Sequence, residues 1–242
     1  LLGGAVTAAL GSLFTGAGGL DLGFVGWGRW TGAFALAFAN DILEAPARTY
    51  TLNLGVPAVR AEQLSRTGRL THPAYLLGDV RMLRFEALPE VDVLIGGPPC
   101  QDFSVVRGPD WDRRGLEAPR GLLFWEMVRA AEVLRPKVVV FENVPGLLSA
   151  NSGRALRILQ TAFAEVGYRP AFIGTVSADW FGAPQQRRRF IGLFVRGRAD
   201  KAPEVAAEVL SAGGSIFKKY PLTPLEAFEG RPLSELGRRY VE

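Results

Sequence analysis

The single cysteine of this sequence, Cys100, stands where a nucleophile would be expected. It follows the apolar run Val91–Ile95 and the residues Gly-Gly-Pro-Pro, a pattern typical of a buried strand that delivers a loop. The two prolines fix two φ angles and remove two amide donors, so the thiol follows a stiff segment. A lone cysteine is more often a small core residue. The polar neighbours Gln101 and Asp102 favour a nucleophile here.

Three further segments carry charged side chains beside apolar runs. The predicted strand Lys137–Phe141 is followed at once by Glu142. Three arginines lead into another predicted strand, and alternation places Arg187 and Arg189 on one face of it, with a solvated basic edge as the alternative. The long polar stretch Asp102–Arg120 is either a solvated loop or a functional loop whose arginines could meet phosphate.

A glycine cluster near the start of the chain indicates a cofactor turn. The predicted strand Ala8–Phe14 runs into Thr-Gly-Ala-Gly-Gly, and Leu20–Trp27 then has helical spacing. In such a unit, backbone amides at the start of the helix can meet a polar cofactor group, although a tight turn alone would also explain the glycines. A second strand, Phe34–Ala39, ends about 20 residues later at Asp41, where an acid would accept hydrogen bonds from a ribose. Together these features predict a nucleoside-containing cofactor.

The elements that must position these residues alternate between strand and helix. Helical spacing predicts helices over Ile42–Leu54, Gly121–Leu134 and Ala155–Val166, the last capped by Asn151 or Ser152. Other strands are predicted at Tyr75–Leu77, Arg169–Ser177 and Arg189–Val195. This order predicts an α/β fold with a doubly wound, mostly parallel sheet. Functional groups of such sheets collect beyond the strand carboxyl ends, so the glycine turn, Asp41, Asp79, Cys100 and Glu142 should share one edge.

Composition limits the chemistry that is available. The length of 242 residues suits one large domain, or one and a part. One cysteine excludes an internal disulfide and a cysteine-based zinc site, and the single histidine, His72, argues against catalytic schemes that need imidazole. We therefore expect no metal. No apolar run reaches membrane-span length, and the net charge of +4 is compatible with a polyanionic partner.

The motifs taken together resemble those of the cytosine-5 DNA methyltransferases that use S-adenosylmethionine. The resemblance covers roughly residues 8–196. The segments that carry it follow the order of the family: Phe14–Gly19, Asn40–Ile42, Gly78–Val80, Gly97–Gln101, Arg120–Phe124, Glu142–Val144 and Pro184–Arg189.

The resemblance implies a Rossmann-like S-adenosylmethionine-dependent methyltransferase fold, with S-adenosylhomocysteine as the cofactor product. The positions that it places against the cofactor are Phe14, Gly16, Ala17, Gly18, Gly19, Asp41, Ile42, Asp79, Val80, Gly97, Pro99 and Leu123. It implies that the Cys100 thiolate adds to carbon 6 of a cytosine flipped out of duplex DNA. Glu142 would hold ring nitrogen 3, and Arg187 and Arg189 would lie near the target base. Carbon 5 would then accept the methyl group, and loss of its proton would release the thiol.

The resemblance also implies a division of the chain and a biological setting. Residues 1–196 would form the catalytic domain, and residues 197–242 a C-terminal extension that starts, or links to, a target recognition domain. The family's recognition domain and final motifs are not recognisable in Gly197–Glu242. The resemblance is therefore to the larger chain of a split enzyme, whose second chain carries them, or to a form that lacks the recognition domain. The expected setting is DNA modification, for example restriction-modification, in a prokaryotic cytoplasm or nucleoid, or encoded by a phage.

Three alternative functions remain open from the sequence. The substrate could be a cytosine in tRNA, although Asp102-Phe103-Ser104 after the cysteine motif looks more like the DNA enzymes. The chain could be a non-catalytic, DNA-binding partner subunit of the same fold, against which the intact Cys100 and Glu142 argue. The glycine spacing alone would also allow a nicotinamide-dependent oxidoreductase, but nothing in the sequence offers a hydride acceptor site.

Overall fold

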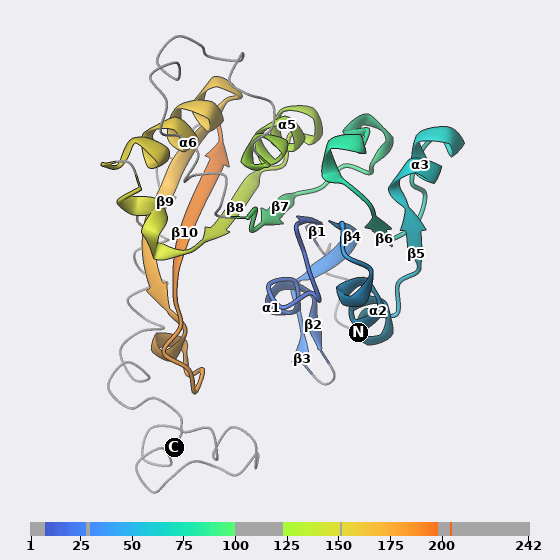
Figure 1. Ribbon diagram of the computed structural model, residues 1–242, viewed down its shortest axis with the longest axis horizontal. Coiled ribbons are helices and arrows are strands. Elements are labelled where there is room, and N and C mark those ends of the chain that lie inside the picture. Colours follow the sequence, from blue (N-terminus) through green and yellow to red (C-terminus); the bar gives the residue numbers. More distant parts are fainter. Residues whose placement is uncertain (1–7, 28–29, 100–122, 151, 198–203, 205–242) are drawn as a thin grey trace, which may run out of the picture.

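The computed structural model describes residues 8–27, 30–99, 123–150 and 152–197, together with Glu204. Within them the chain forms an eight-stranded sheet and a two-stranded hairpin, with helices on both faces of the sheet (Figure 1). The strands of the sheet, in chain order, are β1 (Ala8–Leu13), β4 (Phe34–Asp41), β5 (Ala58–Arg60), β6 (Ala74–Leu77), β7 (Val93–Gly96), β8 (Val138–Asn143), β9 (Tyr168–Ser177) and β10 (Arg188–Arg196). The hairpin consists of β2 (Gly26–Trp27) and β3 (Trp30–Thr31).

Helices connect most of these strands. The α-helices are α1 (Leu22–Val25), α2 (Glu44–Leu54), α3 (Ala61–Thr67), α5 (Phe124–Leu134) and α6 (Arg154–Glu165). Shorter 3-10 turns are η1 (Val80–Met82), η2 (Phe85–Ala87), η4 (Pro145–Leu148) and η5 (Ala178–Phe181). Pro46 lies in the first turn of α2, where its missing amide costs the helix no hydrogen bond.

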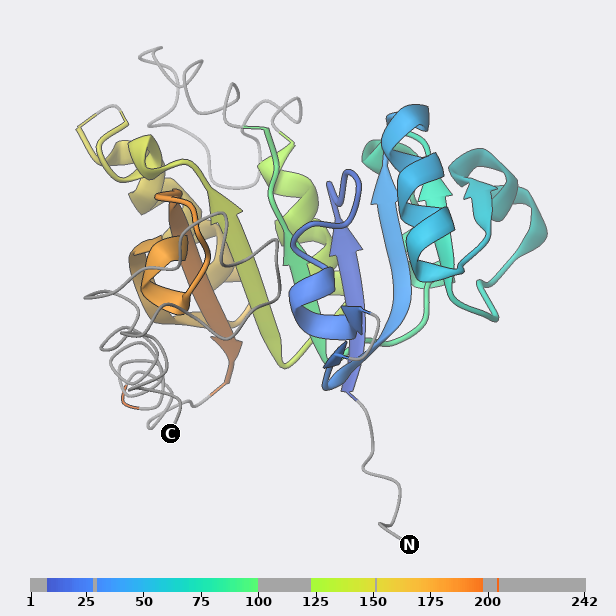
Figure 2. The ribbon, with the colours of Figure 1, turned by 90° about the horizontal axis from the view of Figure 1, so that it is seen from below.

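The strand order of the sheet is β5-β6-β4-β1-β7-β8-β10-β9. The six strands from β5 to β8 are parallel, and β10 runs antiparallel to both β8 and β9 (Figure 2). The chain moves outward from β1 in one direction through β4 and in the other through β7. Loops after β1 and β7 therefore diverge, and such a switch point is where doubly wound sheets bind ligands.

Two layers of helices bury the two faces of the sheet. On one face, α3, α5 and α6 pack on the largest core cluster, which includes Phe124, Phe141, Leu159 and Phe163. On the other face, α1 covers a cluster around Leu10, and α2 covers a cluster around Tyr50 and Tyr75. Figure 1 shows α3, α5 and α6 on one side of the strands and α1 and α2 on the other. The predicted doubly wound, mostly parallel α/β sheet is confirmed.

Several local predictions were wrong. The helix predicted over Leu20–Trp27 is confined to α1, because Gly26 adopts a φ of 79° and the chain turns into the β2–β3 hairpin. The cap of α6 is Gly153 in a left-handed conformation and not Asn151 or Ser152. The edge strand β5 and helix α3 were not predicted, because β5 has only three residues and a mostly exposed side-chain pattern.

Candidate functional site

The carboxyl edge of the parallel strands gathers the residues singled out from the sequence. Gly16 follows β1, Asp41 ends β4, Asp79 comes two residues after β6, and Gly97 directly follows β7. Glu142 is the penultimate residue of β8. Cys100 and the segment Asp102–Arg120 lie outside the described residues.

The turn after β1 has an unusual backbone that its sequence explains. Gly16 and Gly18 have φ angles of 54° and 90°, in the left-handed region that glycine adopts without a side-chain clash. Phe14 also lies there, with a φ of 56°, which is uncommon for a bulky residue and typical of functional loops. A Cβ atom on Gly18 would lie 2.8 Å from the ring of Tyr50. The glycines therefore allow the turn to pack closely against α2.

Asp41 fixes this turn from the neighbouring strand. Its Oδ2 accepts a hydrogen bond of 2.9 Å from the Gly16 amide, and its Oδ1 accepts one of 3.1 Å from the Leu43 amide. The short α1 begins at Leu22, so the amides of the glycine turn do not lie at the start of a long helix, as the sequence had suggested. The Gly16 amide instead meets the carboxylate predicted for ribose binding, and the two predicted elements are joined directly.

The buried carboxylate of Asp21, which was not predicted from the sequence, ties the glycine turn to α2 through hydrogen bonds. Asp21 is fully buried, and it accepts hydrogen bonds of 2.7 Å from Thr15 Oγ1 and 2.9 Å from the Tyr50 hydroxyl. The Tyr75 hydroxyl donates to the Gly16 carbonyl oxygen over 3.2 Å. Burial raises the pKa of Asp21, and burial beside Asp21 raises the pKa of Tyr50. An acid just after a glycine turn, between apolar neighbours, was the signal that could have identified Asp21.

A pocket of about 270 Å³ lies at this edge, beside the switch point. Eight of the positions that the resemblance places against the cofactor line it: Phe14, Asp41, Ile42, Asp79, Val80, Gly97, Pro99 and Leu123. Among the described residues, Gly16, Ala17, Gly18 and Gly19 form the adjoining turn and are not part of the lining. Residues of the lining that were not predicted are Asn40, Leu43, Gly78 and Arg81.

Two contacts shape the walls of this pocket. Asn40 Nδ2 donates to the Leu76 and Gly78 carbonyl oxygens over 2.7 and 3.0 Å, and so ties the ends of β4 and β6 together.

Ile42 and Leu43 are 61% and 59% exposed, which is unusual for side chains of this size. Exposed apolar side chains at the rim of a pocket are typical of a surface that packs on a flat, apolar ligand group.

Asp79 carries its own counter-ion. It accepts a 2.9 Å hydrogen bond from the Arg81 amide and forms an ion pair with the Arg81 guanidinium. The hydrogen bonds from the Arg81 guanidinium lower the pKa of Asp79 from its ordinary value. This wall of the pocket therefore contains a carboxylate whose negative charge is compensated by the guanidinium of Arg81.

Glu142 lies beside Gly97, across the ends of β7 and β8. Its carboxylate pairs with Arg189, with 2.9 Å between Oε1 and Nε, and both side chains are about one quarter exposed, at 26% and 27%. A Cβ atom on Gly97 would lie 2.7 Å from Glu142 Oε2, so a glycine makes room for this carboxylate. Asn143 Nδ2 donates to the Pro98 carbonyl oxygen over 2.9 Å and anchors the segment that leads to Cys100.

The structure separates the two arginines that the sequence grouped together. Arg189 lies in β10 and contacts Glu142. Arg187 precedes the strand and is exposed, and its carbonyl oxygen accepts a hydrogen bond of 3.0 Å from the Ala178 amide. No contact between Arg187 and Glu142 is found in the described part of the chain. Glu142 pairs with Ile191, which lies two positions from Arg189 but four positions from Arg187.

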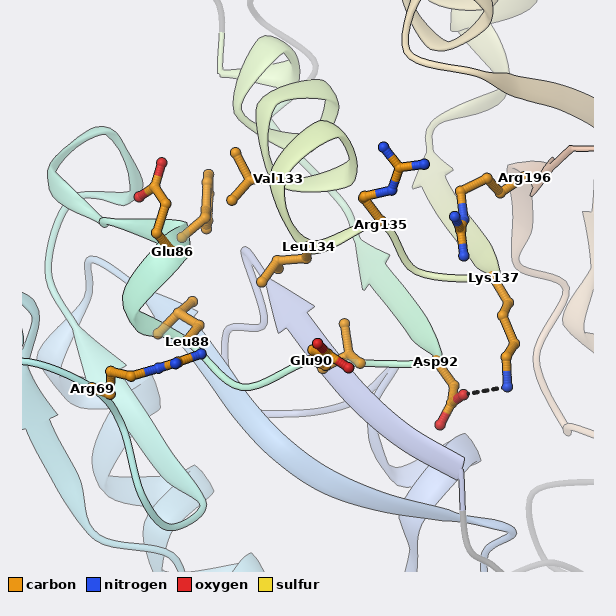
Figure 3. Close-up of a pocket in the computed structure, with 12 residues that line it drawn as sticks. Arg69, Glu86, Leu88, Glu90, Asp92, Val133, Leu134, Arg135, Lys137 and Arg196 are labelled. Atoms are coloured by element: carbon orange, nitrogen blue, oxygen red, sulfur yellow. Dashed lines mark ion pairs between the residues drawn. The ribbon is translucent and has the colours of Figure 1, made fainter.

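A larger pocket, of about 670 Å³, lies at the opposite edge of the sheet (Figure 3). Its lining includes Asp92 and Lys137, which precede β7 and β8, and Arg196, which ends the antiparallel β10. Asp92 forms a 2.7 Å ion pair with Lys137 and accepts a 2.8 Å hydrogen bond from the Ala9 amide, and these partners lower its pKa. None of the predicted site residues that the structure describes lines this pocket, so its greater volume does not make it the candidate site.

The described part of the chain offers neither a metal-ion cluster nor a membrane-spanning helix. Among the described residues, no group of three or more His, Cys, Asp and Glu side chains is arranged to hold a metal ion. In the same part of the chain, no helix has the length and apolar character that crossing a membrane requires.

The chain is similar in sequence to known DNA methyltransferases. The family model described as C-5 cytosine-specific DNA methylase matches residues 9–209. The DNA (cytosine-5-)-methyltransferase M.ApeKI of Aeropyrum pernix is 43% identical over 264 residues, a match that covers 96% of this chain and 55% of that protein. The type II methyltransferase M.AquIA of Picosynechococcus sp. is 35% identical over 186 residues, covering 74% of this chain and 68% of that protein.

Solved structures share the fold at lower identity. A DNA modification methyltransferase encoded within an Escherichia coli prophage matches with a TM-score of 0.55 and 23% identity, over 78% of this chain and 47% of that chain. The Dnmt2 methyltransferase of S. pombe matches with a TM-score of 0.53 and 20% identity, over 79% of this chain and 50% of that chain. This chain spans about half the length of several of the relatives that it matches, for example 55% of M.ApeKI and 44% of the type II methyltransferase M.FnuDI of Fusobacterium nucleatum.

Proposed function

Because the chain belongs to the C-5 cytosine-specific DNA methylase family, we propose that it transfers a methyl group from S-adenosylmethionine to carbon 5 of cytosine in duplex DNA. One observation carries this proposal beyond family membership. Eight residues that the family resemblance assigns to the cofactor, from segments far apart in the sequence, line a single pocket beside the paired Glu142 and Arg189. Binding of one cofactor requires that these side chains share a pocket.

The lining of the pocket fits S-adenosylmethionine. Ile42, Val80 and Leu123 offer apolar surface on which the adenine ring can pack. Asp41 has a free lone pair on each carboxylate oxygen in addition to its two amide contacts, so it can accept hydrogen bonds from ribose hydroxyls. The cofactor, when bound, supplies an electrophilic methyl group. The residues of this chain then have to hold it and present the cytosine.

Glu142 is the residue proposed to bind the target base. The Arg189 guanidinium fixes the position of its carboxylate, which leaves Glu142 Oε2 next to Gly97 and close to the segment that leads to Cys100. A carboxyl group held there can hydrogen-bond ring nitrogen 3 of cytosine while electrons move into the ring. Arg189 acts through Glu142 and is therefore a positioning residue in this proposal.

Cys100 is the proposed nucleophile. Its thiolate adds to carbon 6 of the flipped-out cytosine, carbon 5 then accepts the methyl group, and loss of the carbon 5 proton expels the thiolate. Pro99 lines the pocket and Pro98 is held by Asn143, so the backbone that precedes Cys100 is fixed at the edge of the site. This arrangement requires no histidine.

Binding and transfer assays on the natural protein test the proposal. Isothermal titration should show binding of S-adenosylmethionine and none of NAD, whereas the reverse result would indicate an oxidoreductase. Tritiated methyl groups should enter duplex DNA and not tRNA, and Cys100→Ala should abolish the incorporation. A second chain with the recognition segment stays a prediction, which assays with and without the product of the adjacent reading frame would test. Equal incorporation by wild type and Cys100→Ala would overturn the proposed mechanism.

A further inference from the structure

Arg129, which does not line the pocket, donates two hydrogen bonds to the main chain of the pocket wall. Arg129 lies on α5, the helix that follows the lining residue Leu123. Its Nη2 donates to the Val80 carbonyl oxygen over 3.2 Å and its Nη1 to the Leu83 carbonyl oxygen over 3.1 Å. Val80 is the first residue of η1 and Leu83 is the residue that caps its end, so a single guanidinium spans the whole turn.

Two further contacts fix the guanidinium itself. Glu126 Oε2 accepts a hydrogen bond of 2.8 Å from Arg129 Nε, and the guanidinium carbon lies 4.1 Å from the centre of the Phe85 ring. Ion pairing three residues apart on a helix and stacking on an aromatic face both limit the rotamers of the side chain. The guanidinium of Arg129 is therefore already held in the orientation in which its two terminal nitrogens donate to the turn.

Other restraints on the turn are its own hydrogen bonds and the contacts between Asp79 and Arg81. Its internal hydrogen bonds run from the Met82 amide to the Asp79 carbonyl oxygen and from the Leu83 amide to the Val80 carbonyl oxygen. Met82 is 58% exposed, and the side chains that anchor the turn to the core are those of Val80 and Leu83. Asp79 and Val80 both line the pocket, so any shift of this turn moves the pocket wall.

From these contacts we infer that Arg129 is a positioning residue for the cofactor pocket, an inference that rests on the function proposed above. By holding both carbonyl oxygens against α5, it fixes the spacing between Asp79 and Val80, on one side, and Leu123, the N-cap residue of α5, on the other. Arg129 touches no substrate in this scheme. A displacement of reacting groups by about 1 Å can lower the rate of a reaction roughly 100-fold. A side chain outside the pocket can therefore affect function if it fixes the position of the pocket wall.

Isothermal titration of S-adenosylhomocysteine into purified variants of the natural protein tests this inference. Arg129→Met keeps the bulk of the side chain but removes every donor, and it should weaken binding about tenfold, the equivalent of one charge-assisted hydrogen bond. Arg129→Lys can reach one carbonyl oxygen but not both, and it should weaken binding about threefold. Arg157→Met on α6 is the matched control, because Arg157 also donates to a carbonyl oxygen, that of Ser152, and neither residue lines the pocket.

The outcomes separate the two proposals. Absence of S-adenosylhomocysteine binding by the wild type would overturn the proposed function and not the role of Arg129 alone. Binding by wild type and by a folded Arg129→Met with equal dissociation constants, well below the melting temperature of both, would overturn the positioning role. Should Arg129→Met fail to fold, an unchanged dissociation constant in Arg129→Lys would overturn it equally.

Discussion

Substitution of Gly97 by alanine should separate activity from stability. The φ angle of Gly97 lies outside the left-handed region, so its backbone can accept an alanine. The added Cβ atom would lie 2.7 Å from Glu142 Oε2, and ordinary contacts begin near 3.4 Å. The carboxylate of Glu142 must therefore move by about 0.7 Å to restore an ordinary contact.

The size of the effect follows from what has to move. The displaced atom is the end of a flexible side chain, so the free energy of unfolding should change by less than about 1 kcal/mol. The same movement disturbs the 2.9 Å contact between Glu142 and Arg189 and carries the carboxylate away from the target base. Misplacement of a reacting group by about 1 Å can cost up to roughly 100-fold in rate, and we expect kcat to fall by about 10- to 100-fold.

Steady-state transfer of tritiated methyl groups to duplex DNA would measure this loss, with urea unfolding of the same preparations as the measure of stability. Gly146→Ala is the control, since its Cβ atom would meet nothing within 4 Å although it lies in η4, shortly after Glu142. The control should retain the kcat of the wild type. If Gly97→Ala keeps a kcat within about twofold of wild type, the assignment of Glu142 to the reacting site is wrong, because misplacement there should cost far more.

Three further predictions concern the support of the glycine turn. Tyr50→Phe removes the hydroxyl donor that lies 2.9 Å from buried Asp21. It should lower the free energy of unfolding, measured by urea titration, by about 1–2 kcal/mol. An unchanged midpoint of urea unfolding would contradict a stabilising role of this hydrogen bond. Burial raises the pKa of Asp21 above its ordinary value of 3.8, so the folded state binds this proton more tightly than the unfolded state. The resulting stabilisation is fully present below pH 3.8 and is lost as the pH rises through the folded pKa. Wild type should therefore lose stability relative to Asp21→Asn as the pH is raised from acid to neutral, and parallel urea curves at every pH would refute this. Gly18→Ala combines a φ of +90° with a Cβ atom 2.8 Å from the Tyr50 ring, and it should cost about 2 kcal/mol. Thermal melts should show this loss, with Gly19→Ala, whose Cβ atom meets nothing within 4 Å, close to wild type as the control.

The sequence predicted the edge of the sheet well because the signals are local. Apolar runs that end in glycine, proline or an acid mark where strands stop, and parallel strands bring those ends together. Asp41, Asp79 and Gly97 lie in one pocket for this reason. The α/β class followed from the same alternation of strand and helix.

The remainder depends on contacts between distant segments. The Tyr75 hydroxyl meets the Gly16 carbonyl oxygen across 59 positions of the chain, and no spacing rule signals such a pair. Only the register of β10 against β8 decides that Arg189, and not Arg187, lies beside Glu142. The helix predicted over Leu20–Trp27 was too long because its stop at Gly26 is set by the hairpin that follows it.

The central claim concerns a covalent bond between Cys100 and a cytosine ring. Duplex DNA that carries 5-fluoro-2′-deoxycytidine at random cytosine positions lacks the carbon 5 proton whose loss releases the enzyme, so a covalent complex should accumulate in the presence of S-adenosylmethionine. We predict a complex that survives denaturing electrophoresis for the wild type and none for Cys100→Ala. A wild-type protein that binds the cofactor and the DNA but forms no such complex, or an equal yield from Cys100→Ala, would contradict the account.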